Sequence, residues 1–346
     1  MNANELISHV RCVGAVCAIV STLMSTAAQA DDKTYVMKFT LPTVNEAQHQ
    51  LAKNYAAAVE RDSGGRIKTE IYPASQLGSI PRQIEGVQFG AIQCAIIPPE
   101  FFVGVDERFE IMAAPGLVDS QKDALRLSQD PAVLKLMNGL GANKGLHGVG
   151  MFSTQMSSIV SKTPIRHLGD INGKKLRIFA SQFQSAAFSR LGATPIAMSL
   201  GDVLPALQQG AIDGSIAGLT VYTPFHYQDA AKYVTETNQP AVFIIVEVSQ
   251  KWYDSLPPDL QKIVDEDGAR ESVAIAPQAL QIFATMRKGW TDGGGELISL
   301  PPDEQASMVA TLASVGDDVS KTKPAIRDAY EIVVDASKRV KAASGQ

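Results

Sequence analysis

Cysteine is scarce in this sequence, which has three in 346 residues. Cys12 and Cys17 lie within the first thirty residues, and Cys94 lies in an apolar run at 92–97. Beyond the first thirty residues there is no second cysteine, so an internal disulfide is excluded there and stability must come from the hydrophobic core. Cys94 is expected to be a small buried core residue.

Catalytic and cofactor motifs are also missing. The sequence has no G-x-S-x-G nucleophile elbow, no H-E-x-x-H zinc motif, no P-loop and no dinucleotide-binding fingerprint. No acidic pair is placed for acid–base work, and His49, His147, His167 and His226 are not at metal-ligand spacing. We therefore expect no enzyme, no cofactor and no metal site.

Long apolar runs and excess charge are absent as well. After residue 30 no apolar run approaches the roughly 20 residues that span a bilayer. The formal net charge of −5 argues against nucleic acid and against a basic membrane-binding patch. Hydrophobic residues make up 45% of the chain, and its length suits two ordinary domains or one large one.

The first thirty residues have the pattern of a secretory signal peptide. Arg11 precedes the apolar run CVGAVCAIVSTLM, and Ala28-Gln29-Ala30 places small residues where a signal peptidase cuts. The run is too short for the alternative, a membrane anchor. We expect residues 1–30 to be removed after Ala30 and the mature protein to be periplasmic.

Strand and helix patterns alternate along the rest of the chain. β-like runs cover 35–41, 66–73, 92–97 and 241–248, and T-x-x-E at 43–46 resembles a capping box before an amphipathic helix. A helical pattern from 258 to about 290 has one interruption, Gly268, and would be about 50 Å long. The alternation predicts two successive α/β units with parallel sheets.

The stretch 170–214 reads as strand, helix, strand, helix, strand, and it places Arg177 in the middle of an apolar strand. A buried guanidinium is costly without a partner, and we expect that partner to be an anionic small molecule. The alternative is that Arg177 reaches solvent at the strand end. Two α/β units, export and no catalytic set are typical of a binding protein that closes on a ligand.

Three runs carry a resemblance to a known family: YPASQLGS at 72–79, GKKLR at 173–177, and LGATPIAMSLGDVLPALQQGAIDG at 191–214. In this order they resemble the DctP-type solute-binding proteins of tripartite ATP-independent periplasmic (TRAP) transporters. The resemblance implies a two-lobed, periplasmic-binding-protein-like α/β fold with an interlobe cleft, strand crossovers and a long helix spanning both lobes. It also implies lobe I at 31–153 plus 243–282, and lobe II at 154–242 plus 283–346.

The resemblance gives Arg177 a role, because the family's arginine in the G-x-K-x-R run pairs with the carboxylate of the solute. At three positions that are often charged or polar in the family, this chain has Ser157, Ile216 and Ala217. The loop after the third strand, which often carries an acidic or polar ligand contact, reads Pro98-Pro99-Glu100-Phe101-Phe102 here. A buried hydroxyl without a partner costs about 1–3 kcal/mol. The departures therefore imply a monocarboxylate with a largely apolar body, not a polyol or a polyanion.

The expected ligand-binding residues are Arg177, Phe179, Ser181, Ser157, Gln155, Ile216, Ala217, Met198, Leu200, Pro99 and Glu100. Gln155 and Ser157 are expected to donate hydrogen bonds where many family members have a second arginine. For the apolar side chains in this set, simple core packing is the alternative.

The leading hypothesis is a receptor that delivers an organic acid to a TRAP permease, with the small and large membrane subunits as partners. We expect a monomer. A ligand-sensing module that feeds a membrane receptor is the alternative, and an exported enzyme on this scaffold is a weaker one. The sensing module would use the same cleft as the receptor, so the residues do not separate these two. No set of residues predicts the enzyme.

Overall fold

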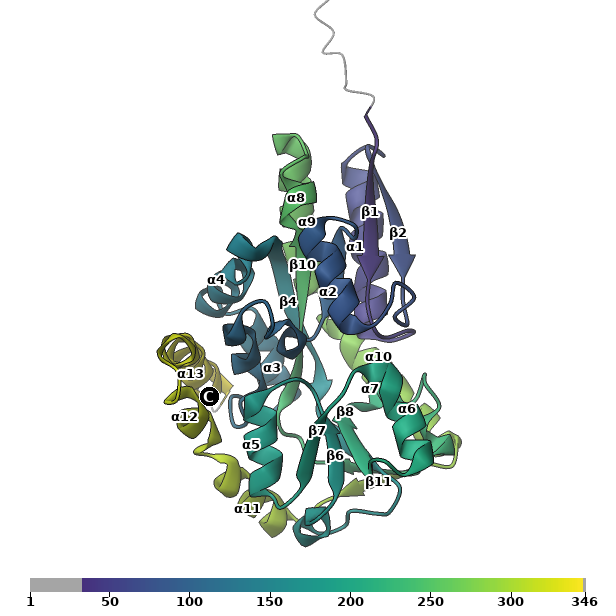
Figure 1. Cartoon of the computed structure of the whole chain (residues 1–346), viewed down its shortest axis with the longest axis vertical. Helices are drawn as coiled ribbons and strands as arrows, with labels where there is room; N and C mark the ends of the chain where they lie inside the picture. The colour runs from purple at the N-terminus through teal and green to yellow at the C-terminus, as the bar shows by residue number, and fades with distance from the viewer. Residues whose placement is uncertain (1–32, 345–346) are drawn as a thin grey trace, which may run out of the picture. The chain divides into compact units, whose positions relative to one another are not determined.

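The computed structural model describes residues 33–344, so the signal-peptide prediction for residues 1–30 lies outside the described residues. Of the described residues, 35–344 belong to one compact unit. Its described part contains a five-stranded sheet and a six-stranded sheet (Figure 1). The first has the order β2-β1-β3-β10-β4, with β1 at Tyr35–Thr40, β2 at Ile67–Tyr72, β3 at Cys94–Ile97, β4 at Leu146–Met156 and β10 at Ala241–Ser249.

The second sheet has the order β11-β9-β5-β8-β6-β7. Its strands are β5 (Ser158–Ser161), β6 (Lys175–Ile178), β7 (Thr194–Ala197), β8 (Gly214–Ala217), β9 (Tyr233–Glu236) and β11 (Glu296–Ser299). The predicted order of strand, helix, strand, helix, strand in 170–214 is confirmed by β6, α5, β7, α6 and β8, where α5 is Gln182–Arg190 and α6 is Leu200–Gln209. We call the first sheet with the helices that cover it the first lobe, and the second sheet with its helices the second lobe.

Helices connect and cover the strands. Before the second sheet these are α1 (Ala47–Asp62), α2 (Ile80–Phe89), α3 (Gln121–Ser128), α4 (Pro131–Gly139) and the 3-10 turns η1 (Pro99–Phe102), η2 (Glu107–Ala113) and η3 (Ala142–Lys144). Within the second sheet's segment they are η4 (Leu168–Ile171), α7 (Leu219–Tyr222) and η5 (Tyr227–Asp229), besides α5 and α6. After β10 follow α8 (Gln250–Tyr253), α9 (Pro258–Ala274), α10 (Ala276–Asp292), α11 (Pro302–Leu312), α12 (Val315–Ser320) and α13 (Pro324–Ser344).

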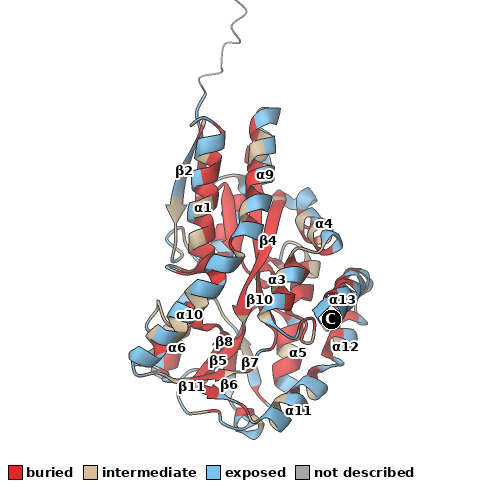
Figure 2. Ribbon diagram, turned by 180° about the vertical axis from the view of Figure 1, so that it is seen from behind, coloured by how far each residue is buried: buried red, intermediate tan, exposed pale blue. Residues whose placement is uncertain are grey.

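Strands β4 and β10 of the first sheet are buried along nearly their whole length (Figure 2), whereas β2 at the edge of the sheet is partly exposed. Successive side chains of a strand point to opposite sides, so β3 serves two cores. Cys94 and Ile96 pack with residues of α1 and α9, whereas Ala95 and Ile97 pack with residues of α2, α3, α4 and α13. Cys94 is a buried free thiol, as predicted. An all-apolar strand is therefore explained by helices on both of its faces.

The sheets are mixed, and the prediction of wholly parallel sheets was wrong in part. β1 is parallel to β2 and β3, and β6 is parallel to β7 and β8. However, β10 runs antiparallel to β3 and β4, and β5 runs antiparallel to β8 and β9. Between β4 and β5 only Ser157 intervenes. A chain that passes directly into another sheet has no crossover helix to set a parallel direction.

Two further local predictions needed correction. The N-cap of α1 is Glu46, whose carboxylate accepts from two backbone N–H groups, while Thr43 donates its hydroxyl to that carboxylate. The predicted long helix is present as α9 followed by α10, and the break lies at Ile275, not at Gly268. Pro277 explains the break, because proline has no N–H to donate to the preceding turn.

The predicted lobe boundaries stay a prediction. The last helix, α13, contacts α3, α4 and η2, whereas α11 contacts α5 and η4.

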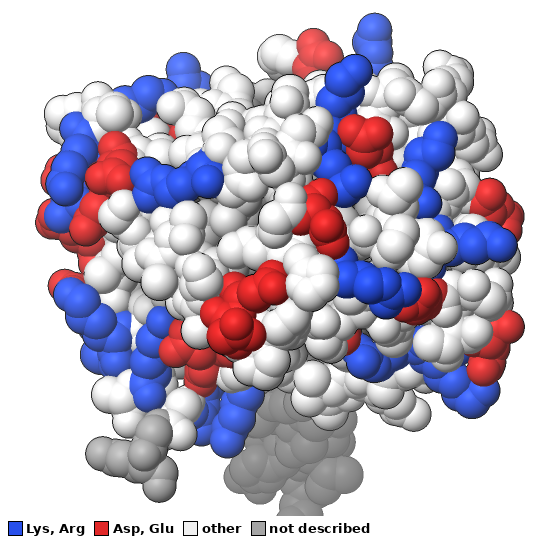
Figure 3. Space-filling model, turned by 90° about the horizontal axis from the view of Figure 1, so that it is seen from below, with Lys and Arg blue, Asp and Glu red and all other residues white. Residues whose placement is uncertain are grey.

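None of the described helices is long and apolar enough to cross a membrane. On the face shown in Figure 3, basic and acidic side chains are interspersed, in keeping with ion pairs such as Arg166–Glu296 and Arg190–Asp318.

Gly268 provides a test of how α9 packs on the first sheet. A Cβ at Gly268 would lie 2.6 Å from Val149 Cγ2, so the helix and β4 would have to move apart. We expect Gly268→Ala to lower the free energy of unfolding by about 1–3 kcal/mol, measured by urea denaturation. Gly201→Ala in α6, where nothing lies within 4 Å, is the matched control and should be neutral or slightly stabilising.

Candidate functional site

Strand β6 positions Arg177 inside the second sheet. Leu176 and Ile178 point into a core cluster with Ile159 and Ile216, so the alternation of the strand turns Arg177 to the opposite face. Arg177 is only 1% exposed, and its backbone lies opposite Ile196 of β7 and Ser215 of β8. The alternative in which it reaches solvent is therefore wrong.

The guanidinium of Arg177 is only partly satisfied. Its Nε donates to the carbonyl oxygen of Met198 at 2.9 Å, and Nη1 donates to the carbonyl oxygen of Ile216 at 3.3 Å. Its Nη2 is buried without a hydrogen-bond partner among the described residues. Burial lowers the pKa of Arg177 to about 10, so the group is still protonated at neutral pH. Arg177 is therefore a buried cation that has hydrogen-bond donors without a partner among the described residues.

Two aromatic rings lie against this cation. The guanidinium carbon of Arg177 is 4.9 Å from the ring centroid of Phe179 and 5.9 Å from that of Phe101. The two rings are 5.3 Å apart. Phe101 lies in η1 after β3 and Phe179 follows β6, so each lobe supplies one ring. Both contacts are within the range of cation–π attraction, and the rings keep water from the guanidinium.

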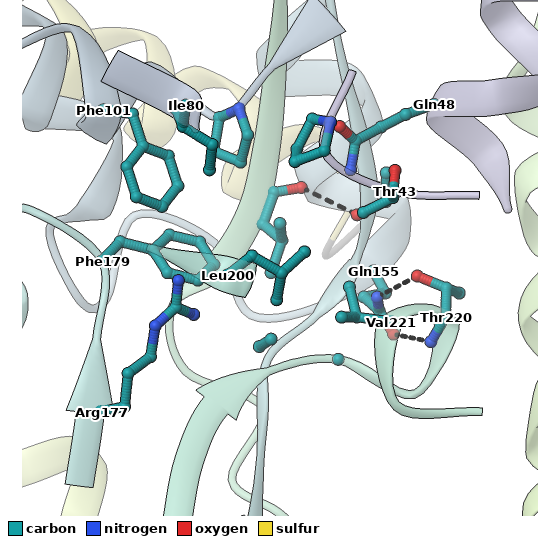
Figure 4. Close-up of a pocket in the computed structure, with 16 residues that line it drawn as sticks. Thr43, Gln48, Ile80, Phe101, Gln155, Arg177, Phe179, Leu200, Thr220 and Val221 are labelled. Carbon is teal, nitrogen blue, oxygen red and sulfur yellow. Dashed lines mark hydrogen bonds between the residues drawn. The ribbon is translucent and has the colours of Figure 1, made fainter. Parts of the chain in front are cut away.

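Arg177 faces a small cavity between the sheets (Figure 4), whose volume is about 30 Å³. Its walls are mainly apolar, and Arg177 is the only charged residue among the described residues that line it. The lining residues are Pro42, Thr43, Gln48, Ile80, Pro98, Phe101, Thr154, Gln155, Arg177, Phe179, Leu200, Ala217, Gly218, Thr220, Val221 and Val242. This volume suits about two water molecules, so entry of a larger molecule requires the walls to separate.

Gln155 closes one side of the cavity. Its amide donates to Thr220 Oγ1 at 2.5 Å and accepts from the Thr220 N–H at 3.4 Å (Figure 4). A Cβ at Gly218 would lie 2.0 Å from the Gln155 side chain, so a larger residue there would displace the Gln155 amide. Thr154 lies 3.5 Å from the carbonyl oxygen of Val242, within donating distance. Hydrogen bonds within the protein therefore hold the side chains of Gln155, Thr220 and Thr154.

The structure places five of the residues expected from sequence on the cavity wall. These are Arg177, Phe179, Gln155, Leu200 and Ala217. Met198 and Ile216 take part through the carbonyl oxygens that bind Arg177.

The other four expected residues do not line this cavity. Ser157 lines a separate cavity of about 260 Å³. Ser181 lines a third hollow, and its hydroxyl caps α5. Pro99 and Glu100 are buried in η1, next to Phe101.

Several residues that line the cavity were not predicted from the sequence. Thr43 lies in the loop before α1 and Gln48 in its first turn, Phe101 lies in η1, and Thr220 and Val221 lie in α7. The loop after the third strand was a signal for Phe101, because connecting segments at strand ends carry function. The capping pattern at 43–46 indicated the turn before α1, which contains Thr43, but only as a structural feature.

Glu100 is a buried carboxyl in the same region. Burial raises its pKa to about 8; Glu110 raises it further, while the Glu100 backbone N–H and Arg177 lower it. Its Oε2 has no hydrogen-bond partner among the described residues. The group is therefore mostly uncharged at neutral pH and does not neutralise Arg177. No group of three or more metal-ligating side chains is found among the described residues.

Comparisons with known proteins agree with this fold. The family model described as bacterial extracellular solute-binding protein, family 7 (DctP) matches residues 40–322. The C4-dicarboxylate-binding periplasmic protein DctP of Rhodobacter capsulatus is 24% identical over 315 residues, which cover 90% of this chain and 94% of that protein.

Two solved structures have the same fold. A TRAP periplasmic solute binding protein from Desulfovibrio salexigens with bound orotic acid has a TM-score of 0.83 and 21% identity, over 89% of this chain and 100% of that one. The sugar acid binding protein DctPAm from Advenella mimigardefordensis, in complex with galactonate, has a TM-score of 0.83 and 22% identity, over 89% and 99%. The predicted two-lobed α/β fold and the resemblance noted from the sequence are confirmed.

Glu100 predicts a pH dependence of stability. Its folded pKa of about 8 lies above its ordinary value of 4.5, so its contribution to stability is present below about pH 4.5 and is lost as the pH rises through 8. Glu100→Gln should make the fall in unfolding free energy between these pH values less steep, by up to about 1.4 kcal/mol per pH unit. Urea denaturation across the pH range measures this slope.

A matched control is Glu85→Gln, since Glu85 is exposed on α2. This variant should keep the slope of the unmodified protein. If Glu100→Gln also kept that slope, the carboxyl of Glu100 would not be protonated in the folded state at neutral pH.

Proposed function

Because this chain belongs to family 7 of the bacterial extracellular solute-binding proteins, we propose that it is a periplasmic receptor for an organic acid anion. The carboxylate of the solute binds Arg177, and the cavity between the sheets holds its body. The family is one of solute-binding proteins and not of enzymes. Transfer of the bound acid to a TRAP permease completes the proposed role.

One observation carries this proposal, namely the unpaired Nη2 of Arg177 in a 1% exposed side chain. Nε and Nη1 each donate one N–H to a carbonyl oxygen, which leaves both N–H bonds of Nη2 free to donate toward the cavity. A carboxylate is the planar anion that a guanidinium binds best, and water exclusion by Phe101 and Phe179 strengthens that attraction. One relative is named for binding C4-dicarboxylates, and two proteins with the same fold have bound orotic acid and galactonate, all of which carry a carboxylate.

The wall around Arg177 favours a monocarboxylate with a largely apolar body. Phe101, Leu200, Val221 and Val242 present carbon surface, and no second cation lines the cavity among the described residues. A second carboxylate would be desolvated there without a counter-charge, which is strongly unfavourable. Contact with hydrocarbon contributes roughly 25 cal/mol per Å² of buried apolar area.

The proposed function includes a location in the cell and membrane partners. The receptor is a periplasmic monomer, released after signal cleavage, that meets the small and large membrane subunits of a TRAP transporter. Genes for two such subunits beside this one would support transport, and a gene for a membrane sensor kinase there would support the sensing alternative.

Arg177 provides the central test. Arg177→Lys keeps a positive charge but loses the planar fork, and Arg177→Met removes the charge. We expect the affinity for the best monocarboxylate to fall at least about 100-fold in both, measured by isothermal titration calorimetry. Arg190→Lys, at an exposed pair with Asp318, is the matched control and should bind normally.

Circular dichroism spectra and melting curves of the variants confirm that each one is folded. A folded Arg177→Met protein that keeps full affinity would contradict the assignment of Arg177 as the carboxylate site.

A further inference from the structure

Gln48 lies on the wall of the cavity opposite Arg177. It belongs to the first turn of α1 in the first lobe, whereas Arg177 belongs to β6 in the second. Figure 4 shows the two side chains reaching the cavity from opposite sides. Gln48 is 3% exposed, so its amide is removed from bulk water as fully as the guanidinium.

The side-chain amide of Gln48 is unsatisfied. Its Oε1 is buried without a hydrogen-bond partner among the described residues. A buried amide without partners is costly, and rotation by 180° lets it present either its oxygen or its NH₂ group to the same point. The backbone beneath it is fixed, because Glu46 accepts from the N–H groups of Gln48 at 2.9 Å and His49 at 3.1 Å.

The other polar side chains on the wall are already engaged. Thr43 donates to Glu46 at 2.5 Å, Gln155 and Thr220 bind each other, and Thr154 has the Val242 carbonyl oxygen within reach. Of the polar side-chain atoms on the described wall, the buried and unpaired ones are Arg177 Nη2 and Gln48 Oε1. They lie at opposite sides of an otherwise apolar space (Figure 4).

We infer that Gln48 is a specificity-determining residue that hydrogen-bonds one uncharged polar group at the end of the solute remote from its carboxylate. This inference rests on the proposed function, in which Arg177 holds that carboxylate. Gln48 is neutral, so the group it recognises is a hydroxyl or a carbonyl, not a second carboxylate. The solute class is then an oxo- or hydroxy-monocarboxylic acid whose oxygen is separated from the carboxylate by an apolar stretch.

A buried hydrogen-bonding side chain discriminates strongly between solutes that carry the matching polar group and solutes that lack it. A site built to hydrogen-bond a solute rejects the analogue that lacks the polar group, because its own buried polar atom is left unpaired. The apolar walls reject additional hydroxyl groups for the converse reason. The Gln48 contact therefore distinguishes the cognate solute from the unsubstituted acid, and the apolar walls distinguish it from the polyhydroxylated acid.

The experiment compares straight-chain monocarboxylates of about four to eight carbons with analogues that carry one oxo or hydroxyl group away from the α-carbon. Calorimetry with the purified protein gives the affinity of each pair. We expect the unmodified protein to prefer the best substituted acid by about tenfold or more over its parent. In Gln48→Met, which keeps the volume of the side chain, that preference falls to about twofold or less, while the parent acid binds at least as well.

Gln50→Met is the matched control, because Gln50 lies on the same helix and bonds Asn54 outside the cavity. It should keep the full preference. Equal binding of substituted and parent acids by the unmodified protein would overturn the role of Gln48, and so would a preference retained in Gln48→Met. Binding of no monocarboxylate at all would instead overturn the proposed monocarboxylate receptor, and the two failures are distinguishable.

Discussion

The buried, incompletely paired guanidinium of Arg177 is the constraint around which the second lobe is arranged. Removing a cation from water is costly, and burial accordingly lowers its pKa. Two carbonyl oxygens, placed by the ends of β7 and β8, and two aromatic rings offset part of that cost. In the proposed function a bound carboxylate offsets the remainder, which favours solutes that carry a negative charge.

The opposite wall of the cavity comes from the other lobe, and this couples binding to the arrangement of the lobes. Phe101 and Gln48 reach the site from η1 and α1, which follow strands of the first sheet. The direct passage from β4 to β5 and the return from β9 to β10 connect the sheets. A solute that contacts both walls stabilises the arrangement in which they are close, and it has no such effect when they are apart.

The sequence was informative where chemistry and local pattern coincide. Arg177 was predictable because a cation in an apolar strand needs a counterpart, and α5 and α6 were predictable from their spacing. Gln48 and Thr220 were not, since neither differs locally from any polar helix residue, and only the tertiary fold brings them to the cavity. Pro277 was a legible signal for the break between α9 and α10, but Gly268 was taken for it, although that glycine serves close packing against Val149.

The buried carboxyls complete the electrostatic argument. Burial raises the pKa of Glu46 to about 7 and that of Glu100 to about 8, and it raises that of Glu110 as well. An ionised Glu100 near Arg177 would neutralise the site and compete with the solute. A protonated one leaves the positive charge of Arg177 available, at the cost of a stability that declines as the pH rises. Burial therefore lowers the pKa of Arg177 without neutralising it at neutral pH, and it keeps the neighbouring carboxyl of Glu100 mostly uncharged.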